Sequence, residues 1–297
     1  MAEFKTKLAC LTVVTMIAST ACAVDIGDDA VVREQKRIQL TGMPNVTIRT
    51  FDGGVELRPW DRNEILVDIE RRASSMAEAR DIVVRTKEEG GNVSIEAVQP
   101  DRRGAFMHLT AHAPSVRMVV TVPRHVNVDV RSGDGNILAR DLTGRIQVNT
   151  GDGAVTLQHL DGEIRINTGD GSVAASDMAG RVAINTGDGA VDVTGRLDAL
   201  TAHSGDGGIR VDAHPGSTMG GEWSITSGDG NVSVRLPPDF NATVDAHTGD
   251  GGITTSGVIV TGSPEAQEHG VLRGQIGKGG EPLTVRTGDG PINIVAR

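Results

Sequence analysis

The sequence predicts an all-β fold, a single-stranded parallel β-solenoid of the β-helix or β-roll type with coils of about 18 residues and two strands each. The tetrapeptide Ser/Thr-Gly-Asp-Gly occurs eight times, and its first five copies lie 18 residues apart. Apolar and polar residues alternate on both sides of the copies. The 297 residues include 39 Gly, four Phe, two Trp and no Tyr. Such a composition suits a thin stacked core of aliphatic side chains.

Each coil is expected to contain two strands that bury alternate residues. The second residue after every Gly-Asp-Gly is β-branched and apolar: Ile137, Val155, Val173, Val191, Ile209, Val232, Ile253 and Ile292. A second apolar pair precedes the next motif, as Ile164 and Ile166 do. This period of two indicates strands with one buried face, which must pair with their counterparts about 4.8 Å away in the next coil. A propeller blade would need roughly 40 residues, so the 18-residue unit argues against that fold.

Residues 1–23 are expected to be an export signal. Lys5 and Lys7 precede the short apolar stretch Leu8 to Ala18, as in secretory signals. Ala21-Cys22-Ala23 fits ordinary signal cleavage, whereas Ser19-Thr20-Ala21-Cys22 resembles a bacterial lipobox that would leave Cys22 lipidated. The mature protein is therefore expected outside the cytoplasm, in the periplasm or at the outer membrane or cell surface, either freely secreted or anchored through Cys22.

Three further segments follow the signal. Residues 24–36 are expected to be a polar tether, and residues 37–130 a β-rich part continuous with the solenoid. That part contains one short helix near Ser74 to Ala79, because Ser74 or Ser75 can cap its N-terminus and Glu78 falls in its first turn. Residues 131–297 form the repeat region, interrupted by an insertion at 256–282. The chain ends soon after the last motif, so the insertion is expected to cover the open strand edge at that end.

The repeated motif has a structural and a functional interpretation. Glycines on both sides of an Asp suit a corner that needs positive φ. Stacking also places eight carboxylates on one edge, where neighbours 4.8 Å apart repel by about 0.9 kcal/mol in water. A cation, with calcium as the natural candidate, would relieve this repulsion. The carboxylates of this candidate cation-binding edge, called the Asp edge below, belong to Asp134, Asp152, Asp170, Asp188, Asp206, Asp229, Asp250 and Asp289.

The residue before the Ser/Thr of the motif predicts a second stabilising feature, a ladder of Asn side chains. Asn149, Asn167 and Asn185 occupy this position in consecutive coils, and stacked Asn side chains can form a hydrogen-bonded amide ladder. His203 and His247 hold the same position later in the chain. They are expected two coils apart, about 10 Å, which is too far to share one metal.

Charge and motifs restrict the function. The formal net charge is −10, which argues against binding to nucleic acid and leaves a lipid anchor as the route to a membrane. The sequence contains no nucleophile elbow, no His pair at metal spacing and no phosphate loop. We therefore expect a non-enzymatic surface protein that binds a cell-envelope or extracellular ligand, with no catalytic residue and no confident metal or cofactor. A carbohydrate-active β-helix enzyme and a calcium-dependent β-roll-like module remain as alternatives.

Several motifs resemble those of one bacterial family. They are the segment Gly-Gly-Val-Glu-Leu-Arg-Pro-Trp-Asp-Arg-Asn-Glu-Ile at 53–65, Val119-Val120-Thr121-Val122-Pro123, the Gly-Asp-Gly series, and Gly274-Gln275-Ile276-Gly277-Lys278-Gly279-Gly280. Together they resemble a family of exported β-strand-repeat proteins described as putative adhesins and built on a domain of unknown function. The resemblance covers about residues 40–297. It implies the fold and a surface role, and it implies no reaction.

Overall fold

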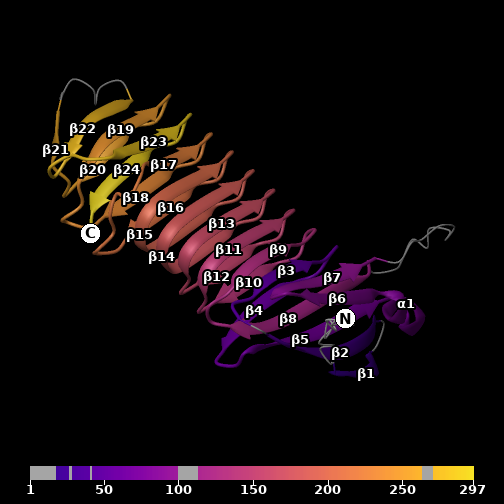
Figure 1. Cartoon of the computed structure of the whole chain (residues 1–297). Helices are drawn as coiled ribbons and strands as arrows, with labels where there is room; N and C mark the ends of the chain where they lie inside the picture. The colour runs from indigo at the N-terminus through magenta and orange to yellow at the C-terminus, as the bar shows by residue number, and fades with distance from the viewer. Residues whose placement is uncertain (1–17, 27–28, 41, 100–112, 263–269) are drawn as a thin grey trace, which may run out of the picture.

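The computed structural model describes residues 18–26, 29–40, 42–99, 113–262 and 270–297, with the backbone alone for 18–26 and 29 (Figure 1). These residues contain one helix, α1 (Met76–Asp81), and 24 strands joined in one sheet. The all-β prediction is confirmed. The predicted helix is also found: the Ser75 hydroxyl caps it by accepting a hydrogen bond from the Glu78 amide.

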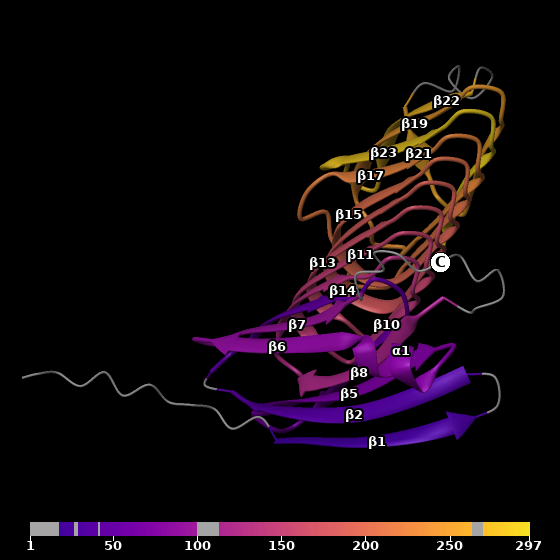
Figure 2. The ribbon, with the colours of Figure 1, turned by 90° about the vertical axis from the view of Figure 1, so that its right-hand side faces the viewer.

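The N-terminal part is a mixed sheet that contains antiparallel and parallel strand pairs. Its strands are β1 (Ala18–Ile26), β2 (Asp29–Gln39), β3 (Asn45–Arg49), β4 (Val55–Trp60), β5 (Glu64–Ala73), β6 (Val83–Glu89), β7 (Asn92–Val98), β8 (Ser115–Pro123) and β9 (Asn127–Arg131). The pairs β1–β2, β2–β5, β5–β8 and β6–β7 are antiparallel, whereas β3 and β4 pair in parallel with β9 and β8. Figure 2 shows β1, β2 and β5 at one end of a long stack.

The segment expected to be a polar tether is instead part of the sheet. Residues 1–17 of the expected signal lie outside the described residues, and its remainder begins β1. Strand β2 pairs with β5 over ten residues. Val31 and Val32 are buried, and the Arg33 guanidinium lies 2.9 Å from the Glu70 carboxylate on β5. Arg33 and Gln35 are exposed on one face of this strand, and Glu34 and Lys36 are half-buried on the other.

The repeats stack in parallel with an 18-residue offset. Their strands are β10 (Ile137–Arg140), β11 (Thr143–Thr150), β12 (Val155–Gln158), β13 (Asp161–Thr168), β14 (Val173–Thr186), β15 (Val191–Ser204), β16 (Ile209–Ala213), β17 (Trp223–Ser227) and β18 (Val232–Leu236). Ile137 pairs with Val155, Val155 with Val173, and Val173 with Val191. Each repeat contributes to two ladders, one before its Gly-Asp-Gly corner and one after it. Strands β14 and β15 each run through the second turn and take part in both ladders.

The core lies between the two ladders and consists of the predicted alternating residues. Ile146, Ile164 and Leu157 are completely buried. Trp223, which the alignment places inward, is also fully buried and packs edge-on against Phe240 with ring centroids 5.1 Å apart. The period-two pattern therefore predicted the buried face of the repeats.

The last repeat in the sequence is not the last in the stack. The remaining strands are β19 (Ala242–Thr248), β20 (Ile253–Ser256), β21 (Val260–Thr261), β22 (Val271–Ile276), β23 (Pro282–Thr287) and β24 (Ile292–Ala296). Strand β23 lies between β17 and β19, and β24 lies between β18 and β20. The chain thus skips one level after β18 and fills the gap with its own C-terminal segment.

The apolar content of the two final repeats accounts for this order. Ile292 and Ile294 on β24 are fully buried, whereas the equivalent pair on β20 is Ile253 and the half-buried Thr255. The more apolar repeat occupies the inner level, where both sides are covered. The insertion covers the outer side of β19, because β22 pairs with it antiparallel. The expected capping is therefore present on this ladder, but it protects β19 and not the final strand of the chain.

Candidate functional site

The Gly-Asp-Gly corner is held by hydrogen bonds from each repeat to the one before it. The Thr186 hydroxyl is 2% exposed and lies 3.1 Å from the Gly169 carbonyl oxygen and 3.0 Å from that of Gly171. The amide of the first glycine of a motif donates a hydrogen bond to the carbonyl oxygen of the first glycine of the neighbouring motif, as Gly169 does to Gly151 at 2.5 Å. The motif therefore forms a corner that is held by buried hydroxyl groups and by backbone hydrogen bonds.

The expected reason for the glycines needs correction. The left-handed φ values occur at the second turn, at Gly144 (139°), Gly162 (130°) and Gly180 (97°), and at no glycine of the motif itself. A methyl group on Gly171 would instead lie 2.2 Å from the Gly153 carbonyl oxygen. Motif glycines are thus required by close approach of successive backbones.

All eight carboxylates of the Asp edge are exposed. The Asp170 amide donates a hydrogen bond of 3.3 Å to the Asp152 carboxylate one repeat away. Within the described ranges, no group of three or more His, Cys, Asp or Glu side chains could hold a metal ion. The Asp edge therefore forms a row of solvated carboxylates, and its proposed calcium binding gains no support from a ligand cluster.

One hydrogen bond of the predicted Asn ladder is present. The Asn167 amide donates to the Asn149 side-chain oxygen at 3.0 Å, and Asn185 is in register with Asn167. A second ladder joins Asn92, Asn45 and Asn127 with bonds of 3.1 and 2.9 Å. This ladder was not predicted from the sequence, because these residues are unevenly spaced along the chain.

His203 and His247 are farther apart than expected. In the register of the ladder, Thr226 and Arg286 stand between them. They are separated by three strand spacings, about 14 Å, because β23 lies inside the stack. They do not form a common site.

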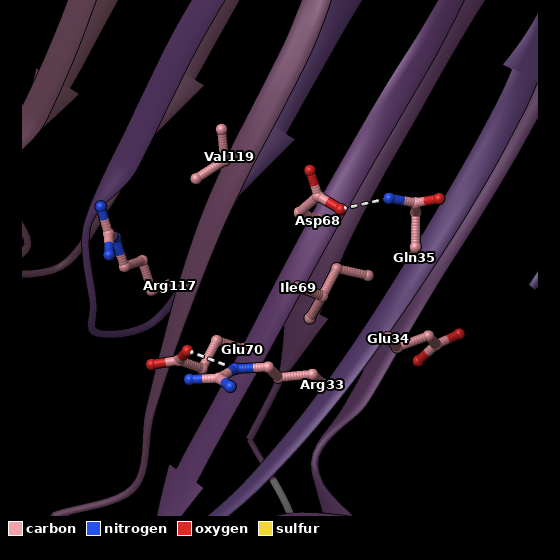
Figure 3. A pocket seen from close by; sticks show the side chains of 8 residues that line it. All are labelled: Arg33, Glu34, Gln35, Asp68, Ile69, Glu70, Arg117 and Val119. Carbon is pink, nitrogen blue, oxygen red and sulfur yellow. Dashed lines mark hydrogen bonds and ion pairs between the residues drawn. The ribbon is translucent and has the colours of Figure 1, made fainter. Parts of the chain in front are cut away.

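A charged pocket of about 420 Å³ lies on the outer face of β2, β5 and β8 (Figure 3). Asp68 and Glu70 enter it together with Arg33 and Arg117. Its polar side chains bind one another: Arg33 pairs with Glu70 at 2.9 Å, and the Gln35 amide donates to Asp68 at 2.7 Å. Sequence reasoning missed this site, since three of its eight lining residues belong to the segment expected to be a tether.

The surroundings lower the pKa of two carboxyl groups in this region, Glu70 and Glu56. Burial would raise the pKa of Glu70, but hydrogen bonds and charge from Arg72 and Arg33 hold it below its usual value. On the adjacent β4, a hydrogen bond from Arg58 lowers the pKa of Glu56 against the opposing effect of burial, with help from the charge of Arg117. A general acid for glycoside cleavage needs a raised pKa. The pocket combines carboxylates with arginines, but the lowered pKa of Glu70 is the wrong direction for that chemistry.

A second surface follows the ladder that precedes the Gly-Asp-Gly corners. We call it the Arg181 face, and its outward side chains are Arg145, Gln147, Asn149, Glu163, Arg165, Asn167, Arg181, Ala183, Asn185, Ala199, Thr201 and His203. A hollow of about 410 Å³ opens on it over β13, β14 and β15. The small side chains of Ala183 and Ala199 form part of its lining. Arg181 is exposed at the hollow.

The expected anchor site lies on β1. Cys22 pairs through its backbone with Arg33 of β2. Among the described residues, no helix is long and apolar enough to span a membrane. Lipidation of Cys22 stays a prediction.

Comparison with known families shows which family the chain belongs to. The model of Toastrack DUF4097 matches residues 43–295. The chain belongs to the Toastrack family. The match covers most of the N-terminal β-rich part and nearly all of the repeat region, which confirms the family resemblance stated from the sequence. No curated protein matches this Toastrack chain.

Solved structures with a related arrangement have low sequence identity. A putative lipid binding protein from Parabacteroides distasonis is 12% identical with a TM-score of 0.47, and the match covers 88% of this chain and 96% of that one. A putative adhesin from Parabacteroides merdae is 9% identical with a TM-score of 0.38, covering 88% and 95%. A putative cell adhesion protein from Clostridium sporogenes is 12% identical with a TM-score of 0.29, covering 95% and 100%. These names describe those proteins and assign no ligand to the Toastrack chain.

Proposed function

We propose that this chain is a non-enzymatic, adhesin-like binding protein outside the cytoplasm. In this proposal the repeat region is a parallel β-solenoid that serves as a rigid support. The Arg181 face binds a cell-envelope or extracellular ligand, and Cys22 provides a lipid anchor. Rigid parallel ladders give an extended surface at small cost in side-chain ordering, which suits binding of an elongated partner.

The observation that carries the proposal is the contrast between the two hollow surfaces. In the β2–β5–β8 pocket, Arg33, Gln35, Asp68 and Glu70 already bind one another. On the Arg181 face, the side chain of Arg181 makes no hydrogen bond or ion pair with any described residue. A ligand gains most where it meets a polar group that has no partner in the free protein.

The enzymatic alternative receives less support. The lowered pKa values of Glu56 and Glu70 disfavour proton donation near neutral pH. The calcium alternative would need several oxygen ligands around one position, and the Asp edge offers one solvated carboxylate per repeat. Binding without chemistry is the function that this geometry favours.

The test uses two charge insertions on the same strand. Ala183 lies on the Arg181 face of β14, and Ala174 lies on the outer face of the opposite ladder of that strand. The exported protein is used to screen a glycan array and to pull ligands from envelope extracts. We expect a ligand whose capture is abolished by Ala183→Glu and kept by Ala174→Glu. Equal capture by both variants, or no ligand in either screen, would reject the proposal.

A further inference from the structure

We propose that the hollow at Arg181 binds a linear polysaccharide that carries carboxylate groups, that is, a uronate-containing glycan. This inference rests on the proposed binding function and names its ligand class. Three features of the Arg181 face carry it: the shape of the hollow, its local charge and its row of amide and hydroxyl groups.

The shape follows from the register of three neighbouring strands. Glu163, Arg181 and Ala199 form one row across β13, β14 and β15, and Arg165, Ala183 and Thr201 form the next. Each row contains one alanine, Ala199 in the first and Ala183 in the second, and each follows a longer arginine side chain, so the surface is lower beside Arg181. The hollow lies over three neighbouring strands of the stack. An extended chain that crosses several repeats fits this geometry.

The charge of the face is opposite to that of the whole chain. Its twelve outward side chains include three arginines and one glutamate, a formal charge of 3 − 1 = +2 on a chain of −10. The Glu163 carboxylate binds both Arg145 at 3.0 Å and Arg165 at 2.7 Å. Arg181 stands beside Glu163 in register but makes no ion pair with a described residue. Its guanidinium can take a carboxylate in a bidentate fork.

Neutral polar side chains lie next to these charged residues and extend the proposed site. Thr201, Asn185 and His203 are exposed beside the hollow. They offer donors and acceptors at the spacing of the strands, which suits the hydroxyl groups of successive sugars. None of the nine lining residues is aromatic, so the hollow lacks the stacking platforms that single-stranded nucleic acids use. A uronate-containing glycan supplies both the carboxylate for Arg181 and the hydroxyl groups for its neighbours.

The test measures binding of the exported protein to three probes by calorimetry. The probes are oligosaccharides of hyaluronan, polygalacturonate and alginate, each with a methyl-esterified form that keeps the hydroxyl groups and loses the charge. We expect at least one probe to bind and its ester to bind about tenfold more weakly or worse, which is the effect of losing one charge-assisted pair.

Arg210→Gln is the matched control for Arg181→Gln. Arg210 is also exposed and without a described partner, but it lies on β16 in the opposite ladder. We expect Arg181→Gln to weaken probe binding about tenfold or more and Arg210→Gln to leave it within twofold. Failure of all three probes, equal binding of the esters, equal effects of the two variants, or capture of only acidic peptides or nucleic acid would overturn the inference. If the probes fail while Ala183→Glu still abolishes capture of another ligand, the ligand class is wrong and the proposed function stands.

Discussion

Substitution of Gly171 by alanine tests whether backbone contact between repeats requires the motif glycines. The added methyl group would lie 2.2 Å from the Gly153 carbonyl oxygen. Real contacts of this kind do not fall below 3.0 Å, so the two backbones must separate by at least 3.0 − 2.2 = 0.8 Å. The obstructing atom is part of the backbone and lies 3.4 Å from the Thr168 hydroxyl, so it cannot turn away as a side chain would.

Overpacking of this kind costs about 1–3 kcal/mol, whereas replacement of a glycine lowers the entropy of the unfolded chain and returns about 0.4–1 kcal/mol. We therefore expect Gly171→Ala to lower the free energy of unfolding by about 1–2 kcal/mol. The measurement is urea unfolding followed by far-UV circular dichroism, in which the midpoint should fall while the slope is unchanged.

Gly252→Ala is the control, because Gly252 directly follows a motif and an added methyl group would meet nothing within 4 Å. Its φ also lies outside the left-handed region, so we expect no loss and a gain of up to about 1 kcal/mol. Equal stability of the two variants would refute the argument from close approach.

Four further outcomes are expected. Thr186→Val should lower the free energy of unfolding by about 1–3 kcal/mol in the same urea assay, since it leaves glycine carbonyls without their buried donor; an unchanged midpoint would contradict this. Glu56 and Glu70 have lowered pKa values in the folded state. Their ionised forms therefore stabilise the folded protein above about pH 4.5, and this contribution is lost as the pH falls through the folded-state pKa values. Glu56→Gln should make the free energy of unfolding less dependent on pH in this range, and an unchanged pH profile would count against the argument. Deletion of 282–297 should abolish hydrogen-exchange protection in β20, because it removes the paired strand β24; protection that persists in β20 would show that the gap can close. Deletion of 258–280 should promote aggregation by uncovering β19, and light scattering that detects only monomer would argue otherwise.

The sequence carried enough information for the repeat region because its pattern is both local and periodic. Alternation around each motif identified the buried residues, including Trp223, and the 18-residue interval set the register of the ladders. A Ser before Glu78 was sufficient to place the single helix. These features depend on neighbours in sequence or on an exact repeat, so they can be read without coordinates.

Other features of the fold could not be predicted, because the alternation of apolar and polar residues fits more than one arrangement of the strands. Every repeat presents the same alternation, so stacking β23 or β19 on β17 satisfies it equally well, and only the relative apolarity of the two repeats decides. The polar residues of β2 look like a linker until Glu70 and Asp68 of β5 supply their partners. In the sequence alone, nothing distinguishes Arg181 from other surface arginines. Its significance depends on the two alanines beside it and on Glu163 being occupied by other arginines.

The position of the final repeat has a consequence for biosynthesis. A ribosome and an export channel both release the chain from its N-terminus, so repeats up to β18 can add to the stack as they emerge. Residues 242–276 emerge next, but the level beneath them stays vacant until residues 282–297 are free. Completion of this end must wait for release of residues 282–297. A stalled or clipped chain would thus retain a bare β17–β18 edge, which marks it as unfinished to any chaperone or protease that recognises open strands.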